Sequence, residues 1–207
     1  MPAVEPYLPV ERVTVWRGDI TDPPADLAID TIVNAANESL LGGGGVDGAI
    51  HRAAGPRLLE HNRTLDGCPT GSAKLTPAFD LVDRGVHRIV HTVGPVWHAG
   101  EHGEAQSLGN THEDVLLANC YVQSLRLAAQ VGSVGVAFPA ISTGVYRFPK
   151  DRAAKIAIGH VLGHLGQHDL PQRVVFCCLL EDDAALYRTL IETRGKWLTS
   201  RRRVPPI

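Results

Sequence analysis

The chain has 207 residues, of which 44% are hydrophobic and only 5% aromatic. This length fits one domain with a sizeable, mainly aliphatic core. The formal net charge of −2 creates no global field that attracts nucleic acid or an anionic membrane, so we expect neither as a partner. One basic cluster, Lys196 with residues 201–203, is interpreted as a solvated tail, with a nucleic-acid contact as the minor alternative.

Apolar runs of strand length alternate with helical patterns along the chain. Strands are predicted at residues 13–16, 29–33, 86–93, 134–138 and 174–180. Helices are predicted at 46–54, 115–129, 154–165 and 182–194. The polar stretch 98–112 is interpreted as an exposed connection. The alternation predicts an α/β domain in three layers, with helices on both faces of a mostly parallel sheet.

Two of these helices show one apolar stripe each. The stripe of the second helix consists of Val115, Ala118, Val122, Leu125 and Ala129. The stripe of the third consists of Ala154, Ala157, Ile158, Val161, Leu162 and Leu165. Apolar residues spaced three and four apart share one face of a helix, so we expect both stripes to be buried against the sheet.

The four cysteines form no C-x-x-C pair, which favours a reduced protein without structural disulfides or zinc. Cys177 and Cys178 are adjacent, so on a strand their side chains point to opposite faces. The N-terminal residues lack the apolar segment of a signal peptide, and no apolar run has the length of a membrane span. We therefore expect a soluble, cytoplasmic protein without a bound metal or cofactor.

Two glycine-rich loops each follow a predicted strand and precede a predicted helix. The first spans residues 42–48 and the second spans 141–146. Loops of this type expose backbone N–H groups at a helix N-terminus, where the helix dipole also favours negative charge. Two such loops in one α/β domain predict a ligand with more than one phosphate, held between them at the strand ends.

The first loop also matches a dinucleotide fingerprint, through Gly43, Gly45 and Gly48. In a Rossmann unit these glycines follow the first strand directly. Here residues 34–41 intervene and an earlier strand precedes them, so the Rossmann interpretation is rejected. The sequence also contains no P-loop motif.

Several polar residues flank the loops. Asn34 and Asn37 follow a strand, where they can either cap a turn or hold a polar ligand. Asp47 and His51 are four residues apart and share one face of a helix. Asp19 ends the first strand, where its carboxylate can serve a turn or accept a hydrogen bond from an exocyclic amine. Their combination with the glycines favours a functional site.

Five motifs in this order resemble the macrodomain family, and most closely its MacroD-type subgroup of ADP-ribose ester hydrolases. They are Gly18-Asp19-Ile20-Thr21, residues 32–37, residues 42–47 with 51–55, residues 91–95, and residues 139–144. The resemblance implies a three-layer α/β/α macrodomain at 12–195, with a mixed, mostly parallel sheet. Residues 1–11 are then an N-terminal extension and 196–207 a basic C-terminal tail.

The resemblance also implies residue roles. Asp19 and the backbone of Ile20 contact adenine, and Asp47 lies beside the anomeric carbon of the distal ribose. Leu179 stands where the subgroup often has an aromatic residue that stacks on adenine. Two loops cradle the diphosphate: Gly43, Gly44, Gly45 and Val46 in the first, and Ser142, Thr143, Gly144, Val145 and Tyr146 in the second. Tyr146 also covers the distal ribose, and the implied catalytic residues are Asn34, Asn37, Asp47 and His51, with both asparagines on the ribose hydroxyls.

The implied activity is hydrolysis of O-acetyl-ADP-ribose or of ADP-ribose esters on Asp and Glu of modified proteins, which are the implied partners. Such an ester expels a carboxylate whose conjugate acid has a pKa of about 4, so no strong general acid is needed. One aspartate that positions a water is then sufficient. The alternatives are an ADP-ribose-binding module without turnover and a general NAD-dependent enzyme.

Overall fold

The computed structural model describes residues 8–98 and 111–201, with side chains as far as Arg194. Most of the predicted connection 98–112 lies outside the described residues. The same holds for the first seven residues of the predicted extension and the last six of the predicted tail.

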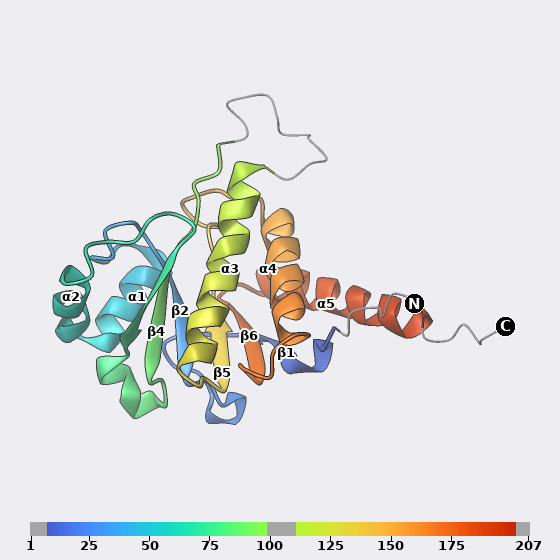
Figure 1. The fold of residues 1–207 in the computed structure, drawn as a ribbon, viewed down its shortest axis with the longest axis horizontal. Coiled ribbons are helices and arrows are strands. Elements are labelled where there is room, and N and C mark those ends of the chain that lie inside the picture. Colours follow the sequence, from blue (N-terminus) through green and yellow to red (C-terminus); the bar gives the residue numbers. More distant parts are fainter. Residues whose placement is uncertain (1–7, 99–110, 202–207) are drawn as a thin grey trace.

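A six-stranded sheet forms the centre of the molecule (Figure 1), in the order β1-β6-β5-β2-β4-β3. All neighbouring strands are parallel except β3, which runs antiparallel to β4. The prediction of a mixed, mostly parallel sheet is therefore confirmed. The strands are β1 (Val13–Arg17), β2 (Thr31–Ala36), β3 (Ala73–Pro77), β4 (Arg88–Val93), β5 (Gly135–Phe138) and β6 (Arg173–Cys178).

Helices cover both faces of this sheet (Figure 1). Helices α1 (Gly45–Ala54) and α2 (Pro56–Arg63) pack on one face, around Ile32, Ile50 and Leu58. The opposite face is covered by α3 (His112–Gln130), α4 (Lys150–Leu165) and α5 (Glu181–Arg201). Each face thus has its own buried cluster, and the predicted three-layer architecture is confirmed.

One strand and one α-helix were not predicted from the sequence. Strand β3 contains a lysine and ends at Pro77, as an edge strand can, since a proline lacks the N–H of an interior ladder. Helix α2 has only eight residues and begins at Pro56, immediately after Gly55 ends α1. Its apolar periodicity is too short to register as a separate helix.

Strand β2 begins two residues later than predicted and ends three residues later. Asp30 is held outside the strand, because its carboxylate accepts hydrogen bonds from the Ser133 hydroxyl (2.5 Å) and the Val134 N–H (2.7 Å). Asn34 therefore belongs to the strand itself, which affects the geometry of the site. Only Asn37 lies in the loop beyond it.

The predicted buried stripe of α3 is wrong in part. Val115 and Val122 are exposed, whereas Leu117, Tyr121 and Leu125 are fully buried. These larger side chains recur every four residues and bury more apolar surface than the valines, so they set which face meets the sheet. The predicted stripe of α4 is confirmed, because all of its members are buried.

The C-terminal helix is longer than predicted. It was expected to end at Arg194, but α5 continues to Arg201. The first six residues of the predicted tail, 196–201, are therefore helical.

Cys177 and Cys178 pack into opposite core clusters, as predicted for neighbours on a strand. All four cysteines are buried free thiols. Among the described residues, no helix combines the length and the apolar character that a membrane crossing requires.

The topology places a crevice at the carboxyl end of β2. The chain leaves β2 toward α1 on one face of the sheet, whereas β4 and β5, its two neighbours, lead to α3 and α4 on the other face. Such a reversal opens a space between the connecting loops, and ligands of open α/β sheets bind there.

Candidate functional site

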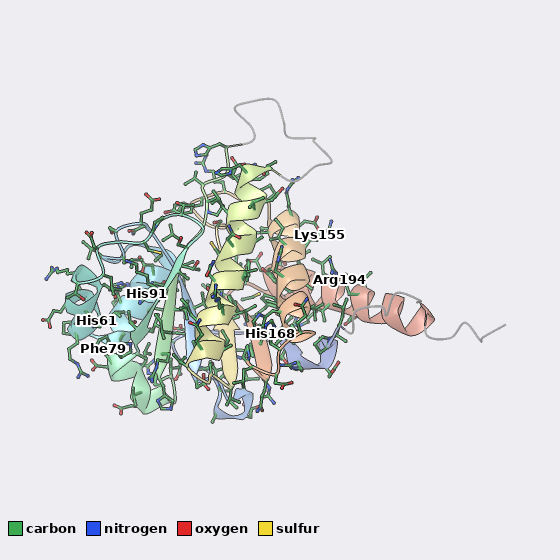
Figure 2. The ribbon with its side chains drawn as sticks, viewed as in Figure 1. His61, Phe79, His91, Lys155, His168 and Arg194 are labelled. Carbon is green, nitrogen blue, oxygen red and sulfur yellow. The ribbon has the colours of Figure 1, made fainter. Side chains whose placement is uncertain are left out.

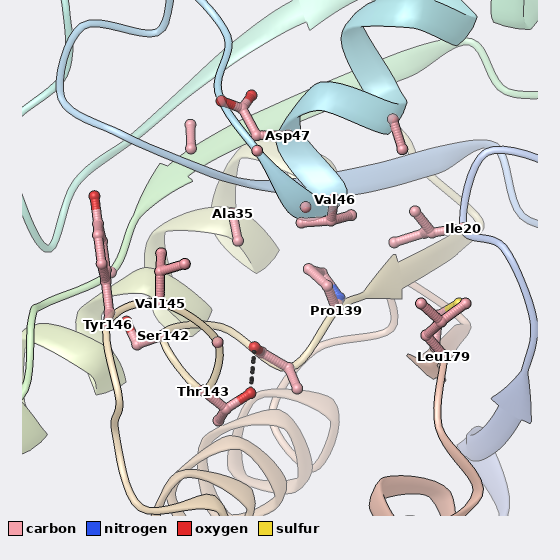
Figure 3. A pocket seen from close by; sticks show the side chains of 18 of the residues that line it. Ile20, Ala35, Val46, Asp47, Pro139, Ser142, Thr143, Val145, Tyr146 and Leu179 are labelled. Carbon is pink, nitrogen blue, oxygen red and sulfur yellow. Dashed lines mark hydrogen bonds between the residues drawn. The ribbon is translucent and has the colours of Figure 1, made fainter.

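One cavity of about 580 Å³ opens at this crevice (Figure 3), between loops that follow β1, β2, β5 and β6. This volume is in the usual range for a small-molecule site. Almost all of the residues singled out from the sequence line it. They are Asp19, Ile20, Asn37, Gly43, Gly44, Gly45, Val46, Asp47, Ser142, Thr143, Gly144, Val145, Tyr146 and Leu179.

The first glycine loop needs its glycines for two different reasons. Gly42 and Gly45 have φ angles of 91° and 58°, a left-handed conformation that other residues rarely adopt. At Gly43 the reason is space, because a Cβ there would lie 3.0 Å from Asp47 Oδ2 and 3.2 Å from Asn37 Nδ2. The backbone therefore passes directly against the two polar side chains. At Gly44, the N-cap of α1, no side-chain cap bond is present among the described residues.

The second loop is tied to the sheet end and to the segment after β4. The Trp97 N–H donates to the Tyr146 carbonyl over 2.8 Å. Ser142 adopts a φ of 65°, and a Cβ on Gly94 would lie only 2.1 Å from the Ser142 hydroxyl oxygen. The Thr143 hydroxyl donates to the Ala140 carbonyl over 2.9 Å (Figure 3), so this side chain stabilises the loop from within.

Asp47 lies in the first turn of α1 and is 3% exposed. Its Oδ1 accepts a hydrogen bond of 2.7 Å from Asn34 Nδ2, and His51 Nε2 lies 3.6 Å away. Its Oδ2 is buried and has no hydrogen-bond partner among the described residues. Burial raises the pKa of Asp47, although the bond from Asn34 and the nearby His51 act in the opposite direction. The carboxylate is thus a stronger base than an exposed aspartate.

Two predicted site residues do not reach the cavity. Asn34 is completely buried and its side chain contacts Asp47 and His91 instead. His51 lies behind Gly42 and faces Asp47. The expectation that Asn34 holds a ribose directly is therefore not met by this geometry, because the extended β2 turns its side chain toward α1. Both residues contact the Asp47 carboxylate, and neither lines the cavity.

Asn37 lines the cavity and also organises its own loop. Its Nδ2 donates to the Gly42 carbonyl over 2.9 Å. Its Oδ1 accepts from the Ser39 N–H and hydroxyl over 3.0 and 2.6 Å. One hydrogen of the Nδ2 group is thus used within the loop, and a second is available to a ligand in the cavity.

The opposite end of the cavity is formed by the loops after β1 and β6. Asp19 Oδ1 accepts two bonds of 2.9 Å from the N–H and hydroxyl of Thr21, which fix the orientation of the carboxylate. Ile20 and Leu179 lie together at this end, away from Tyr146 (Figure 3). Leu179 is 76% exposed, so its side chain offers apolar surface to a ligand.

The comparisons with known proteins identify the family. The Macro domain family model matches residues 33–157. The chain belongs to the macrodomain family. An O-acetyl-ADP-ribose deacetylase of Escherichia fergusonii is 50% identical over 188 residues, which are 89% of this chain and 97% of that protein.

Solved macrodomains share the fold of this chain. A mutant of the Oceanobacillus iheyensis macrodomain with ADPR has a TM-score of 0.76 at 36% identity, covering 88% of this chain and 92% of that one. The Trypanosoma brucei macrodomain in complex with ADP-ribose has a TM-score of 0.73 at 38% identity, covering 87% and 69%. The predicted macrodomain fold is thereby confirmed.

The macrodomain cavity also includes a residue whose role the sequence did not suggest. Asp183 was assigned only to the first turn of the last helix, but its side chain lines the cavity and pairs with Lys150 over 2.6 Å. An acidic residue at a helix N-terminus is common for electrostatic reasons alone, so no local pattern distinguishes this one.

Among the described residues, no cluster of metal-binding side chains is present.

The contact between Gly94 and Ser142 yields a test of how the second loop is held. Gly94→Ala should lower the free energy of unfolding by about 1–3 kcal/mol, because the new methyl group overlaps the Ser142 hydroxyl. Gly144→Ala is the matched control, since a Cβ at Gly144 meets nothing within 4 Å. Urea unfolding of both variants measures the difference. Equal free energies of unfolding would show that the loop accommodates the methyl group without cost.

Proposed function

We propose that this macrodomain binds ADP-ribose and hydrolyses its esters, with O-acetyl-ADP-ribose as the first substrate to assay. Proteins that carry ADP-ribose on Asp or Glu are the second substrate class in the proposal. The relative named as an O-acetyl-ADP-ribose deacetylase covers nearly the whole domain at 50% identity and supports this choice. Both reactions consume one water and release ADP-ribose and a carboxylic acid.

The observation that carries the proposal is the environment of Asp47. A carboxylate with one oxygen fixed by Asn34 and the other without a protein partner lies at the wall of a cavity with two glycine loops. In the proposed complex the loops hold the diphosphate through backbone N–H groups. Asp19 and Ile20 then contact adenine, and Asn37 and Tyr146 contact the distal ribose.

For an ester at the anomeric carbon, Asp47 Oδ2 accepts a hydrogen bond from the attacking water. The water oxygen forms a bond to the ribose carbon, and the bond from that carbon to the acyl oxygen breaks. The electron pair leaves with the carboxylate, and the proton of the water passes to Asp47. The carboxylate departs without protonation, so one side-chain base is sufficient.

Asp47→Ala tests this role. We expect the rate of ADP-ribose release to fall by about 10²- to 10⁴-fold, as for loss of a group that positions or deprotonates the nucleophile. The dissociation constant of ADP-ribose, measured by calorimetry, should change little, because loop amides carry the binding. Asp47→Asn is the matched control for shape and should be equally slow. Turnover at the wild-type rate in either variant removes Asp47 from the mechanism.

The raised pKa of Asp47 predicts a pH dependence. The base acts as a carboxylate, so the rate is highest above its pKa and falls as the pH drops through that value. Because burial raises the pKa of Asp47 from 3.8, the acid limb of the kcat profile should lie above that of an exposed aspartate. A stopped assay across the acidic range locates the limb. A profile that stays flat down to pH 3.8 contradicts the assignment.

A panel of defined linkages tests the leaving-group argument. Glutamate-linked ADP-ribose should be released at least about 10²-fold faster than serine-linked ADP-ribose, since a serine alkoxide requires protonation that one base does not supply. Equal rates for the two peptides would contradict this. Substrate peptides matched in sequence except for the modified residue provide the control.

The alternative function is an ADP-ribose-binding module without turnover. The buried carboxylate argues against it, because binding alone does not require a desolvated base. A time course with wild-type protein and O-acetyl-ADP-ribose separates the two functions. Tight binding of ADP-ribose without release of acetate would favour the module.

A further inference from the structure

A line of buried polar side chains crosses the sheet and leads to the cavity wall. It begins at Thr76 on β3, continues through His91 on β4 and Asn34 on β2, and ends at Asp47 on α1. The first three of these residues are at most 1% exposed, and Asp47 is 3% exposed. Figure 2 marks the position of His91 within the fold.

We propose that His91 is a positioning residue for Asp47, acting through the side-chain amide of Asn34. The proposal rests on the proposed function for its effect on turnover, but its structural part does not. His91 touches neither the cavity nor a reacting atom, so it is not a catalytic residue.

The hydrogen bonds determine which atoms donate. A carboxylate oxygen only accepts, so the Asn34 atom 2.7 Å from Asp47 Oδ1 must be the amide nitrogen. The same nitrogen lies 3.0 Å from His91 Nδ1. Its two hydrogens thus go to Asp47 and His91, and His91 Nδ1 must be an acceptor. The proton of the neutral ring is then on Nε2, which donates to the Thr76 hydroxyl over 3.1 Å.

His91 is suited to remain an acceptor. It is fully buried, and burial lowers its pKa to about 3, with smaller contributions from His51 and His61. The ring centroids of His51 and His91 are 6.4 Å apart. His91 therefore stays neutral at any physiological pH, and its Nδ1 keeps accepting from Asn34.

The consequence for Asp47 follows from the shape of the amide. If His91 did not hold the Asn34 nitrogen, the amide could rotate and place its oxygen beside the carboxylate. Two oxygens without a proton between them repel, and Asp47 would lose the hydrogen bond that lowers its pKa. The groups around Asp47 that act on its titration are Asn34 and His51. His91 Nδ1 on β4 is thus a second acceptor, beside Asp47 Oδ1, that favours this orientation of the Asn34 amide.

The decisive experiment compares His91→Leu with His91→Asn. Leucine removes the acceptor with little change in volume, whereas the Asn oxygen can replace Nδ1. The pKa of Asp47, measured by carbon-detected NMR, should rise in His91→Leu and return close to the wild-type value in His91→Asn. In parallel, kcat for O-acetyl-ADP-ribose should fall by about 10- to 100-fold in His91→Leu, as for a small misplacement of a reacting group. Asparagine should restore most of that loss.

The dissociation constant of ADP-ribose shows whether the cavity of each variant is still folded. It should stay within about twofold of wild type in both variants, because His91 does not line the cavity. A binding loss that parallels the kcat loss overturns the proposal. An unchanged Asp47 pKa in His91→Leu, or equal defects in the two variants, also overturns it.

If His91→Leu does not fold, Thr76→Val gives a second route. Valine removes the acceptor for Nε2–H but leaves the Asn34 donor to Nδ1, so nitrogen NMR should still detect the Nε2–H tautomer that we expect in the wild type. An Nδ1–H tautomer in the wild type overturns the proposal. Wild-type protein with the expected tautomer and pKa shifts but without ester turnover would refute the proposed function and support the positioning role.

Discussion

The hydrogen bond from Asn34 to Asp47 is the interaction on which the site depends. It joins the central strand of the sheet to the first turn of α1, and it gives a buried carboxylate its one donor among the described residues. Burying such a group without a donor costs several kcal/mol. The bond therefore holds the start of α1 in place over β2. Because Gly43 passes within contact of the same carboxylate, the path of the first glycine loop depends on it as well.

Two opposing electrostatic effects meet at this point. The N-terminus of α1 and its glycine loop favour anions, whereas the buried position of Asp47 disfavours its own negative charge. The result is a raised pKa rather than a lowered one. The cavity thus has anion-favouring loops along its wall and, at Asp47, a carboxylate of increased basicity. In the proposed function, this separation assigns binding to the loops and base catalysis to Asp47.

Contacts with neighbouring segments hold both loops around the cavity. Asn37 closes its loop through the Gly42 carbonyl, and the backbone of Tyr146 is bonded to Trp97. Trp97 packs on Phe148, with ring centroids 4.5 Å apart. Each loop is thus bonded to a residue that closely follows the end of a strand.

The sequence by itself determined the features that depend on neighbours along the chain. The alternation of apolar runs and helical stripes predicted the layered α/β fold, and the glycines beside Asp47 and Ser142 predicted two loops facing one ligand. The resemblance of five ordered motifs pointed to the macrodomain family, which the family model confirms. These signals are local, because a loop conformation or a helix start is encoded within a few residues.

Tertiary structure alone decided the features that depend on segments far apart in the chain. Strand register placed Asn34 beside His91, 57 positions away, and turned its side chain from the cavity toward Asp47. Packing chose the buried face of α3, and the fold of the last helix brought Asp183 to the cavity. No local pattern encodes such contacts, because each arises only when the free energy of the whole core selects one arrangement. The sequence thus predicted most of the residues that line the cavity, and the packing of the sheet determined which of them are in contact.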